Sequence, residues 1–159
     1  MENIAIKLIY FFMDGCGWCE RFLPQWKLIK DKIENKDLEH IKTYEFERSE
    51  LKKNERALKI QNHVEVNGFP TIVIKINNEY YKYEGNRTFC DILKFIKTKL
   101  VENKLLKQNL IDYFDEKIKQ YELEYPIQNG GNADYKKKYH KYKDMYNSLL
   151  KKYNKLKSD

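Results

Sequence analysis

Two cysteines separated by two residues, Cys16 and Cys19, are the side chains in this sequence best suited to chemistry. They follow an apolar run that breaks at Asp14, and an amphipathic pattern begins directly after them. A helix that starts at this pair presents its unpaired N–H groups and its positive dipole end to the first sulfur, which favours a thiolate near neutral pH. The second sulfur is close enough to form a disulfide with the first. The spacing therefore predicts thiol–disulfide exchange, with Cys16 as the nucleophile and Cys19 as the resolving thiol.

The same spacing also occurs in zinc sites and in buried structural cysteine pairs. A zinc site needs two further ligands, and neither Cys90 nor any histidine forms a matching pair in the sequence. Cys90 falls beside the apolar face of an expected helix and is interpreted as a packed thiol. We therefore expect no metal and no bound cofactor besides the redox pair itself. Three scattered histidines are expected at the surface: His40, His63 and His140.

Periodic patterns in the sequence predict the elements that must position this pair. Strands and helices are expected in the order β-α-β-α-β-β-α, with the first strand apolar on both faces and so central in its sheet. The expected strands cover residues 4–13, 41–46, 71–76 and 79–83. The expected helices cover residues 17–34, residues 49–61 with Ser49 as the N-cap, and the stretch that starts near residue 88.

With the cysteine pair, three further motifs in this order resemble the thioredoxin and protein disulfide isomerase family over residues 4–100. They are a helix-kinking proline five residues beyond the second cysteine (Pro24), a Gly-Phe-Pro-Thr-Ile run at 68–72 like the family's cis-proline loop, and a Tyr-x-Gly-x-Arg motif at 83–87. The resemblance implies an α/β, thioredoxin-like three-layer fold. A central mixed four-stranded sheet is expected, followed by a C-terminal helical extension.

The resemblance also implies a protein-disulfide oxidoreductase in which the loop at Phe69 and Pro70 packs against the cysteine pair. We expect Phe69 to offer its backbone N–H and C=O to an extended substrate, as a sheet edge does. Trp18 is expected to shield the site and to contact partners. Arg87 is the residue that we expect to modulate the thiol pKa values electrostatically.

Two positions depart from the family pattern. Tyr10, six residues before the first cysteine, stands where thioredoxin and the isomerases have a buried acid thought to carry the proton of the resolving thiol. Tyr10 is therefore expected to be a weaker polar substitute. The pair between the cysteines, Gly17 and Trp18, is neither the Gly-Pro of the reductant nor the Gly-His of the isomerase. The redox direction is left open.

The net charge of +7 is concentrated at the C-terminus. Residues 135–159 contain nine lysines and two aspartates, which sum to +7, so residues 1–134 sum to zero. Such asymmetry is typical of an interaction segment. Three cysteines are too few for a disulfide-stapled secreted scaffold, and no signal peptide or membrane-spanning run is recognisable. The expected location is the cytoplasm, without secretion.

Four segments are predicted: a thioredoxin-like domain over 1–103, a helical extension over 104–125, a Gly/Asn linker over 126–134 and a basic tail over 135–159. Tyrosines and leucines in the tail recur at alternating spacings of four and three, which is typical of an amphipathic helix or a short coiled coil. Self-association, a protein partner, an anionic membrane and nucleic acid are all open as its target, and so is a solvated tail without a partner.

The linker and the lysine–tyrosine run are similar to tails on proteins of giant cytoplasmic DNA viruses. This similarity implies a location in the host cytoplasm, in the virion, or in both. Two hypotheses for function follow. The chain exchanges disulfides of protein substrates with an unknown reductase or oxidase, or it is a thioredoxin-fold binding module that its basic C-terminal helix recruits to a complex.

Overall fold

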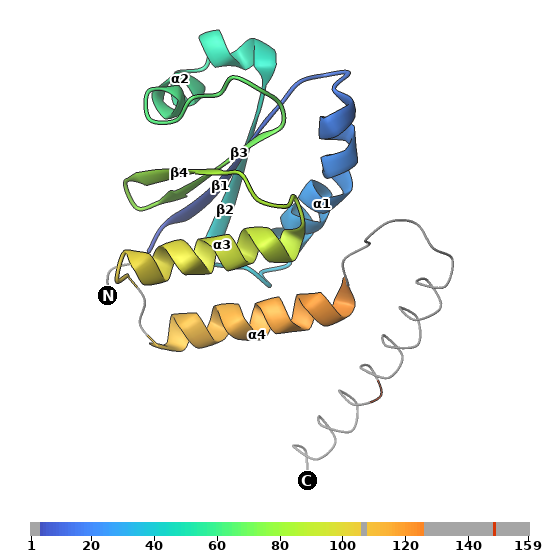
Figure 1. Cartoon of the computed structure of the whole chain (residues 1–159), viewed down its shortest axis with the longest axis vertical. Helices are drawn as coiled ribbons and strands as arrows, with labels where there is room; N and C mark the ends of the chain where they lie inside the picture. The colour runs from blue at the N-terminus through green and yellow to red at the C-terminus, as the bar shows by residue number, and fades with distance from the viewer. Residues whose placement is uncertain (1–3, 106–107, 126–147, 149–159) are drawn as a thin grey trace. The chain divides into compact units, whose positions relative to one another are not determined.

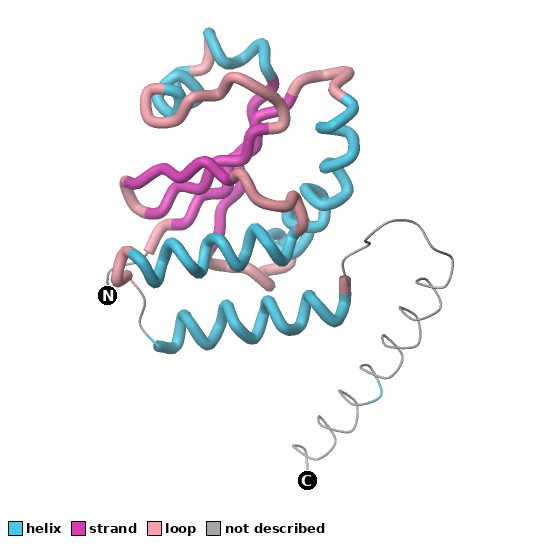
Figure 2. Tube along the Cα trace, in the orientation of Figure 1, coloured by secondary structure: helices cyan, strands magenta, loops and turns pink. Residues whose placement is uncertain are grey.

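The computed structural model describes residues 4–105, 108–125 and 148 (Figures 1 and 2). Over residues 4–105 and 108–125, four strands and the first three α-helices follow the order expected from the sequence pattern, one 3-10 helix precedes α2, and a fourth α-helix follows. Their bounds are β1 (Ile6–Phe12), α1 (Gly17–Glu34), β2 (Ile41–Glu47), the 3-10 helix (Arg48–Lys52), α2 (Glu55–Gln61), β3 (Thr71–Ile76), β4 (Glu79–Tyr83), α3 (Phe89–Glu102) and α4 (Gln108–Glu124).

The four strands form one mixed sheet in the order β2-β1-β3-β4. β1 pairs in parallel with β2 and antiparallel with β3, and β3 forms an antiparallel hairpin with β4. β1 lies inside the sheet, which explains why its sequence is apolar on both faces. The predicted fold class, a mixed four-stranded sheet of thioredoxin type, is confirmed.

Helices cover both faces of the sheet, as Figure 1 shows. On one face Tyr10 of β1 packs against Phe22 and Trp26 of α1, and α3 contacts α1. On the other face Ile9 of β1 belongs to a cluster that includes Ile60 of α2. Because successive strand residues point to opposite faces, β1 contributes side chains to both layers of the core.

The helix predicted over 49–61 ends at Gln61 as expected, but its predicted start, with the N-cap at Ser49, is wrong. A 3-10 helix begins there instead, because the Glu47 carboxylate accepts from the Ser49 N–H at 2.6 Å while the Glu50 carboxylate accepts from the Glu47 N–H at 2.8 Å. α2 then begins separately, with Asn54 as its N-cap accepting from two backbone N–H groups. Side chains that satisfy the first N–H groups of a helix define where it starts.

Two units make up the chain, Met1–Leu106 and Lys107–Asp159. In the first unit α3 ends at Glu102. The side-chain amide of its C-cap residue, Asn103, donates to the Tyr81 hydroxyl at 2.6 Å, and Lys104 follows with a φ of +54°. In the second unit α4 is a helix of its own. The linker predicted over 126–134 and the tail predicted over 135–159 lie outside the described residues, apart from residue 148.

Candidate active site

The start of α1 is built by a tight turn at the end of β1. Gly15 has a φ of +71°, a conformation that only glycine adopts without strain, and the Cys16 N–H donates to the carbonyl oxygen of Met13 at 3.3 Å. Cys16 then stands as the N-cap of α1, with extended backbone angles. Its side chain therefore occupies the position from which a cap accepts the unpaired N–H groups of the first helical turn.

The sulfur of Cys16 acts as this cap. The backbone N–H of Cys19 donates to Cys16 Sγ at 3.4 Å, and both cysteine side chains are more than nine-tenths buried. All three cysteines of the chain are present as thiols. Since a helix N-terminus stabilises negative charge, this geometry favours ionisation of the first sulfur.

The two sulfurs differ in acidity. Interaction with the side chain of Cys19 lowers the pKa of Cys16, helped by the N–H groups of Cys19 and Trp18 and opposed by partial burial. Burial raises the pKa of Cys19, and its side-chain interaction with Cys16 raises it further. Cys16 is thus the thiol that ionises first, and Cys19 is the one that keeps its proton.

The loop before β3 lies against the first cysteine. The peptide bond between Phe69 and Pro70 is cis, and the Cys16 thiol donates to the carbonyl oxygen of Phe69 at 3.6 Å. Because β3 is the antiparallel neighbour of β1, the sheet itself carries the two segments to the same place. The structure thus brings together Cys16, Cys19 and Phe69 although 53 positions separate Cys16 from Phe69.

Tyr10 lies beneath the start of α1. Its hydroxyl donates to the carbonyl oxygen of Cys19 at 3.5 Å, and its ring packs against Phe12, Phe22 and Trp26. The side chain is 3% exposed, and burial raises the pKa of Tyr10 far above its ordinary value. Tyr10 is therefore a hydrogen-bond donor here and does not supply a base.

The other two predicted site residues lie at the border of the site. Trp18 is 62% exposed, and the Arg21 guanidinium lies over its ring at 4.7 Å. Arg87 donates to the carbonyl oxygen of Pro70 at 3.4 Å, so in the described part of the chain its hydrogen bond goes to the loop and not to a cysteine. This contact links the Tyr-x-Gly-x-Arg motif to the cis-proline loop.

Thr71 contributes to the site without having been singled out in the sequence. Its hydroxyl donates to the carbonyl oxygen of Gly68 at 2.7 Å and so closes the loop that carries the cis bond. The available signal was its type and place, a hydroxyl residue directly after Pro70, because short hydroxyl side chains satisfy nearby backbone groups in turns.

The remaining cysteine and the histidines lie in separate places. Cys90 is buried in the first turn of α3, His40 lies 3.7 Å from the Glu39 carboxylate, and His63 stacks on Tyr80. His140 lies outside the described residues. Across residues 4–105 and 108–125, no group of three or more His, Cys, Asp and Glu side chains is arranged to hold a metal ion. Over the same ranges no helix is both long and apolar enough to cross a bilayer.

A mixed sheet with a Cys-x-x-Cys pair at a helix start and a cis-proline loop against it defines a thioredoxin-like domain. The chain belongs to the thioredoxin family, because the thioredoxin family model matches residues 2–98. The predicted family membership is confirmed.

Curated relatives match the same part of the chain. Thioredoxin domain-containing protein R362 of Acanthamoeba polyphaga mimivirus is 33% identical over 90 residues, which are 56% of this chain and 25% of the relative. Bloodstream-specific protein 2 of Trypanosoma brucei brucei is 33% identical over 101 residues, or 60% of this chain and 18% of the relative. The matches span a quarter or less of the length of these relatives.

Among solved structures, one match is to a thioredoxin domain of a mammalian protein. The first thioredoxin domain of mouse protein disulfide-isomerase A4 is 23% identical, with a TM-score of 0.47. That match covers 59% of this chain and 62% of the mouse domain chain.

Proposed function

We propose that the chain is a thiol–disulfide oxidoreductase that acts on disulfides of protein substrates through Cys16 and Cys19. Membership of the thioredoxin family supports this proposal. The observation that carries it is the division of acidity between the two sulfurs. The N-terminus of α1 and the side chain of Cys19 favour the thiolate of Cys16, while burial keeps Cys19 protonated.

In the direction of substrate reduction, the Cys16 thiolate attacks one sulfur of the substrate disulfide. The Cys16–substrate disulfide forms, and the other substrate sulfur leaves as a thiolate and takes up the proton that Cys16 has lost. Cys19 then gives up its proton and attacks Cys16 Sγ, so that the substrate sulfur bound to Cys16 leaves and is protonated. Two electrons pass from the cysteine pair to the substrate, and an external dithiol must restore the pair. The reverse sequence oxidises a substrate dithiol, and neither direction requires a bound cofactor.

Two surfaces would hold the substrate. The backbone of Phe69, beside Cys16, offers its polar groups to an extended chain, and the exposed ring of Trp18 offers apolar contact area. Arg87 would act on the site by holding the Pro70 carbonyl and with it the loop. These roles require that a substrate displace the Cys16 thiol from the Phe69 carbonyl as the thiol ionises.

A trapping experiment tests the proposal. Cys19→Ser should leave covalent mixed disulfides between Cys16 and protein substrates that reductant releases. Cys16→Ser should trap none, and Cys90→Ser in the Cys19→Ser background should trap as many as Cys19→Ser alone. If Cys19→Ser traps nothing, the enzymatic proposal is wrong. Equilibration of the Cys16–Cys19 pair with glutathione would then give the direction: about −270 mV marks a reductant, and about −180 mV or above an oxidant or isomerase.

The second function that we propose for comparison is a binding module recruited by its basic tail. The charge distribution favours it, because residues 135–159 hold the whole net charge of the chain. Removal of 135–159 should abolish recruitment and leave the reactivity of Cys16 unchanged. The mimivirus relative supports the host cytoplasm or the virion as the location, and detection of the chain in purified particles would distinguish them.

A further inference from the structure

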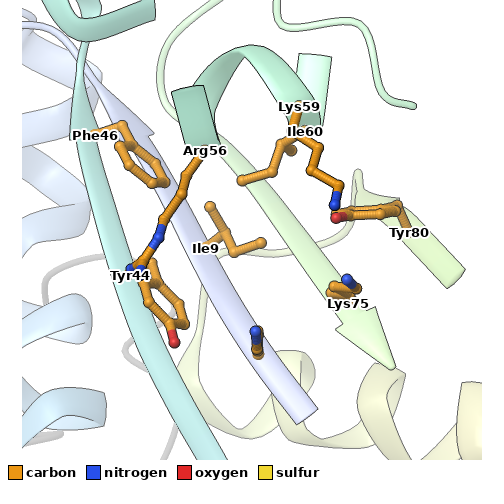
Figure 3. Close-up of a pocket in the computed structure, with 9 residues that line it drawn as sticks. Ile9, Tyr44, Phe46, Arg56, Lys59, Ile60, Lys75 and Tyr80 are labelled. Atoms are coloured by element: carbon orange, nitrogen blue, oxygen red, sulfur yellow. The ribbon is translucent and has the colours of Figure 1, made fainter. Parts of the chain in front are cut away.

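The face of the sheet that α2 covers changes character along the strands. Under α2 it is apolar, with Phe11, Phe46 and Val73 in one cluster. Toward the start of β1 the same face becomes basic, because Lys7 lies two residues before Ile9 and therefore points to the same side. At the border between the two parts lies a cavity of about 230 Å³, which we call the basic hollow. Its lining residues are Lys7, Ile9, Tyr44, Phe46, Arg56, Lys59, Ile60, Lys75 and Tyr80 (Figure 3).

Three lysines stand in a row across the sheet at this end. Lys7 of β1 is the direct register partner of both Lys42 of β2 and Lys75 of β3. Neighbouring strands lie only about 4.8 Å apart, and like charges that face each other across strands destabilise a sheet. The row is therefore costly in the free chain, and a bound anion would remove the repulsion.

No carboxylate lines the basic hollow. Its nine lining residues include four cationic side chains and no acidic one. Within the described part of the chain none of the four forms an ion pair. Three of the four lie over aromatic rings: Lys7 lies 5.5 Å and Arg56 5.8 Å from the Tyr44 ring, and Lys75 lies 4.8 Å from the Tyr80 ring.

The cations converge from two sides. Arg56 and Lys59 reach down from α2 while Lys75 rises from the sheet, and Tyr44 and Tyr80 stand on opposite sides of Ile9 and Ile60 (Figure 3). The apolar floor at Ile9 and Ile60 suits a planar apolar group, which gains free energy when it leaves water, and Tyr44 and Tyr80 form the rim on the two edge strands. Arg56 and the lysines suit an anion with several charges, for which a guanidinium fork and ammonium groups are the usual partners in proteins.

We propose that the basic hollow binds a small organic phosphate that carries a planar ring, of the class of nucleoside polyphosphates. The ring lies on the apolar floor at Ile9 and Ile60, and the phosphates lie among Lys7, Lys75 and Arg56. The cavity is slightly smaller than the roughly 300–1,000 Å³ of pockets that enclose drug-sized ligands, so the ring enters and the phosphates remain at the opening. Cations gathered around one cavity favour a small ligand over a nucleic acid strand, which needs a groove.

The test measures ATP binding to the full-length chain by calorimetry at fixed salt. A Lys7→Gln, Lys75→Gln double variant should weaken binding at least tenfold. The matched control, Lys27→Gln with Lys36→Gln, removes the same charge from exposed lysines of α1 and the turn after it, and should change binding less than twofold. Equal losses in both variants would mean non-specific attraction to a basic protein and would overturn the proposal.

Further probes separate the parts of the ligand. Adenosine alone should bind more weakly than ATP. Inorganic tripolyphosphate should bind at least fivefold more weakly than ATP, and equal affinity of tripolyphosphate and ATP would overturn the role of the ring. A ten-nucleotide single strand that binds more than tenfold tighter than ATP, and that loses this affinity in the double variant, would replace the small ligand with nucleic acid. If the double variant does not fold, the unmodified chain is acetylated chemically with and without ATP. Bound ATP should protect Lys7 and Lys75 from acetylation, and absence of protection overturns the proposal.

Discussion

The hydroxyl of Tyr10 donates a hydrogen bond to the carbonyl oxygen of Cys19 across 3.5 Å, and so joins the central strand to the first turn of α1. A buried phenol replaces the carboxylate that the family resemblance implies at this position. Burial raises the pKa of Tyr10, so the hydroxyl keeps its proton and donates at neutral pH. Its contact with Cys19 lowers the pKa of that thiol, which burial otherwise raises.

Replacement of Tyr10 by phenylalanine should therefore raise the pKa of Cys19 further. Resolution of a mixed disulfide at Cys16 should slow roughly two- to tenfold at neutral pH, because less Cys19 thiolate forms, and the difference should shrink at higher pH. The measurement is the rate of glutathione release from glutathionylated Cys16 as a function of pH. The matched control is Tyr83→Phe, which also loses a bond from a buried tyrosine to a carbonyl, that of Asn86 at 2.6 Å. Equal rates in all three proteins would refute the role of Tyr10.

Cys16 should be the most reactive thiol of the chain at mildly acidic and neutral pH. Since its pKa is lowered, its alkylation by iodoacetamide should follow a titration whose midpoint lies below the ordinary thiol value of about 8.5. The largest cause of the shift is the side chain of Cys19, so Cys19→Ala should move the midpoint upward, whereas Cys19→Ser keeps a hydroxyl donor and should move it less. Mass spectrometry of each cysteine peptide gives the rates, and a midpoint of 8.5 or above in the unmodified chain contradicts the prediction.

A buried tryptophan anchors α1 to the edge strand. Trp26, which is 2% exposed, donates its Nε1–H to the Glu45 carboxylate at 2.6 Å, and Lys30 lies 3.4 Å from the same carboxylate. Glu45→Ala should lower the free energy of unfolding by about 1–2 kcal/mol, because it leaves the indole N–H without its partner, while Glu45→Gln should retain most of the stability. Urea denaturation measures both. Glu84→Ala, which removes an exposed carboxylate 4.0 Å from Lys82, should change stability by less than about 0.5 kcal/mol.

The helix cap at Asn54 provides a test of the corrected boundary. Asn54→Ala should destabilise the protein by about 0.5–2 kcal/mol, because two N–H groups of α2 lose their acceptor. Ser49→Ala should cost less than Asn54→Ala, since it keeps the backbone N–H of Ser49 that donates to the Glu47 carboxylate in the capping box. Thermal unfolding of the two variants gives the comparison, and a larger loss for Ser49→Ala would restore the boundary predicted from the sequence.

The pattern of the sequence predicted the strands and the first helix because their signals are local. The bounds of α1, β3 and β4 agree with the prediction, since each begins or ends at a glycine, an asparagine or a proline-containing turn. The start of α2 could not be predicted in this way. It depends on carboxylates of Glu47 and Glu50 that form caps only once the end of β2 has its final geometry.

The contrast between local sequence signals and tertiary geometry applies also to the cysteine site and to the basic hollow. Cys16 and Cys19 were identified because a short spacing carries their chemistry, and Phe69 and Pro70 because a motif marks them. The basic hollow was not identified, because its cations come from β1, β3 and α2 and meet only through the register of the sheet. A lysine row such as Lys42, Lys7 and Lys75 is recognisable only when the pairing of strands is known.

The contact between Cys16 and Phe69 has a consequence for how the protein can be monitored. It joins the ends of two neighbouring strands that are far apart in the sequence, so it exists only while the sheet is intact. When the sheet unfolds, the first turn of α1, whose N–H groups help to lower the pKa of Cys16, loses its support as well, and Cys16 becomes an ordinary thiol. The rate at which Cys16 reacts with a chromogenic disulfide can therefore report the folded fraction of a preparation without any added label.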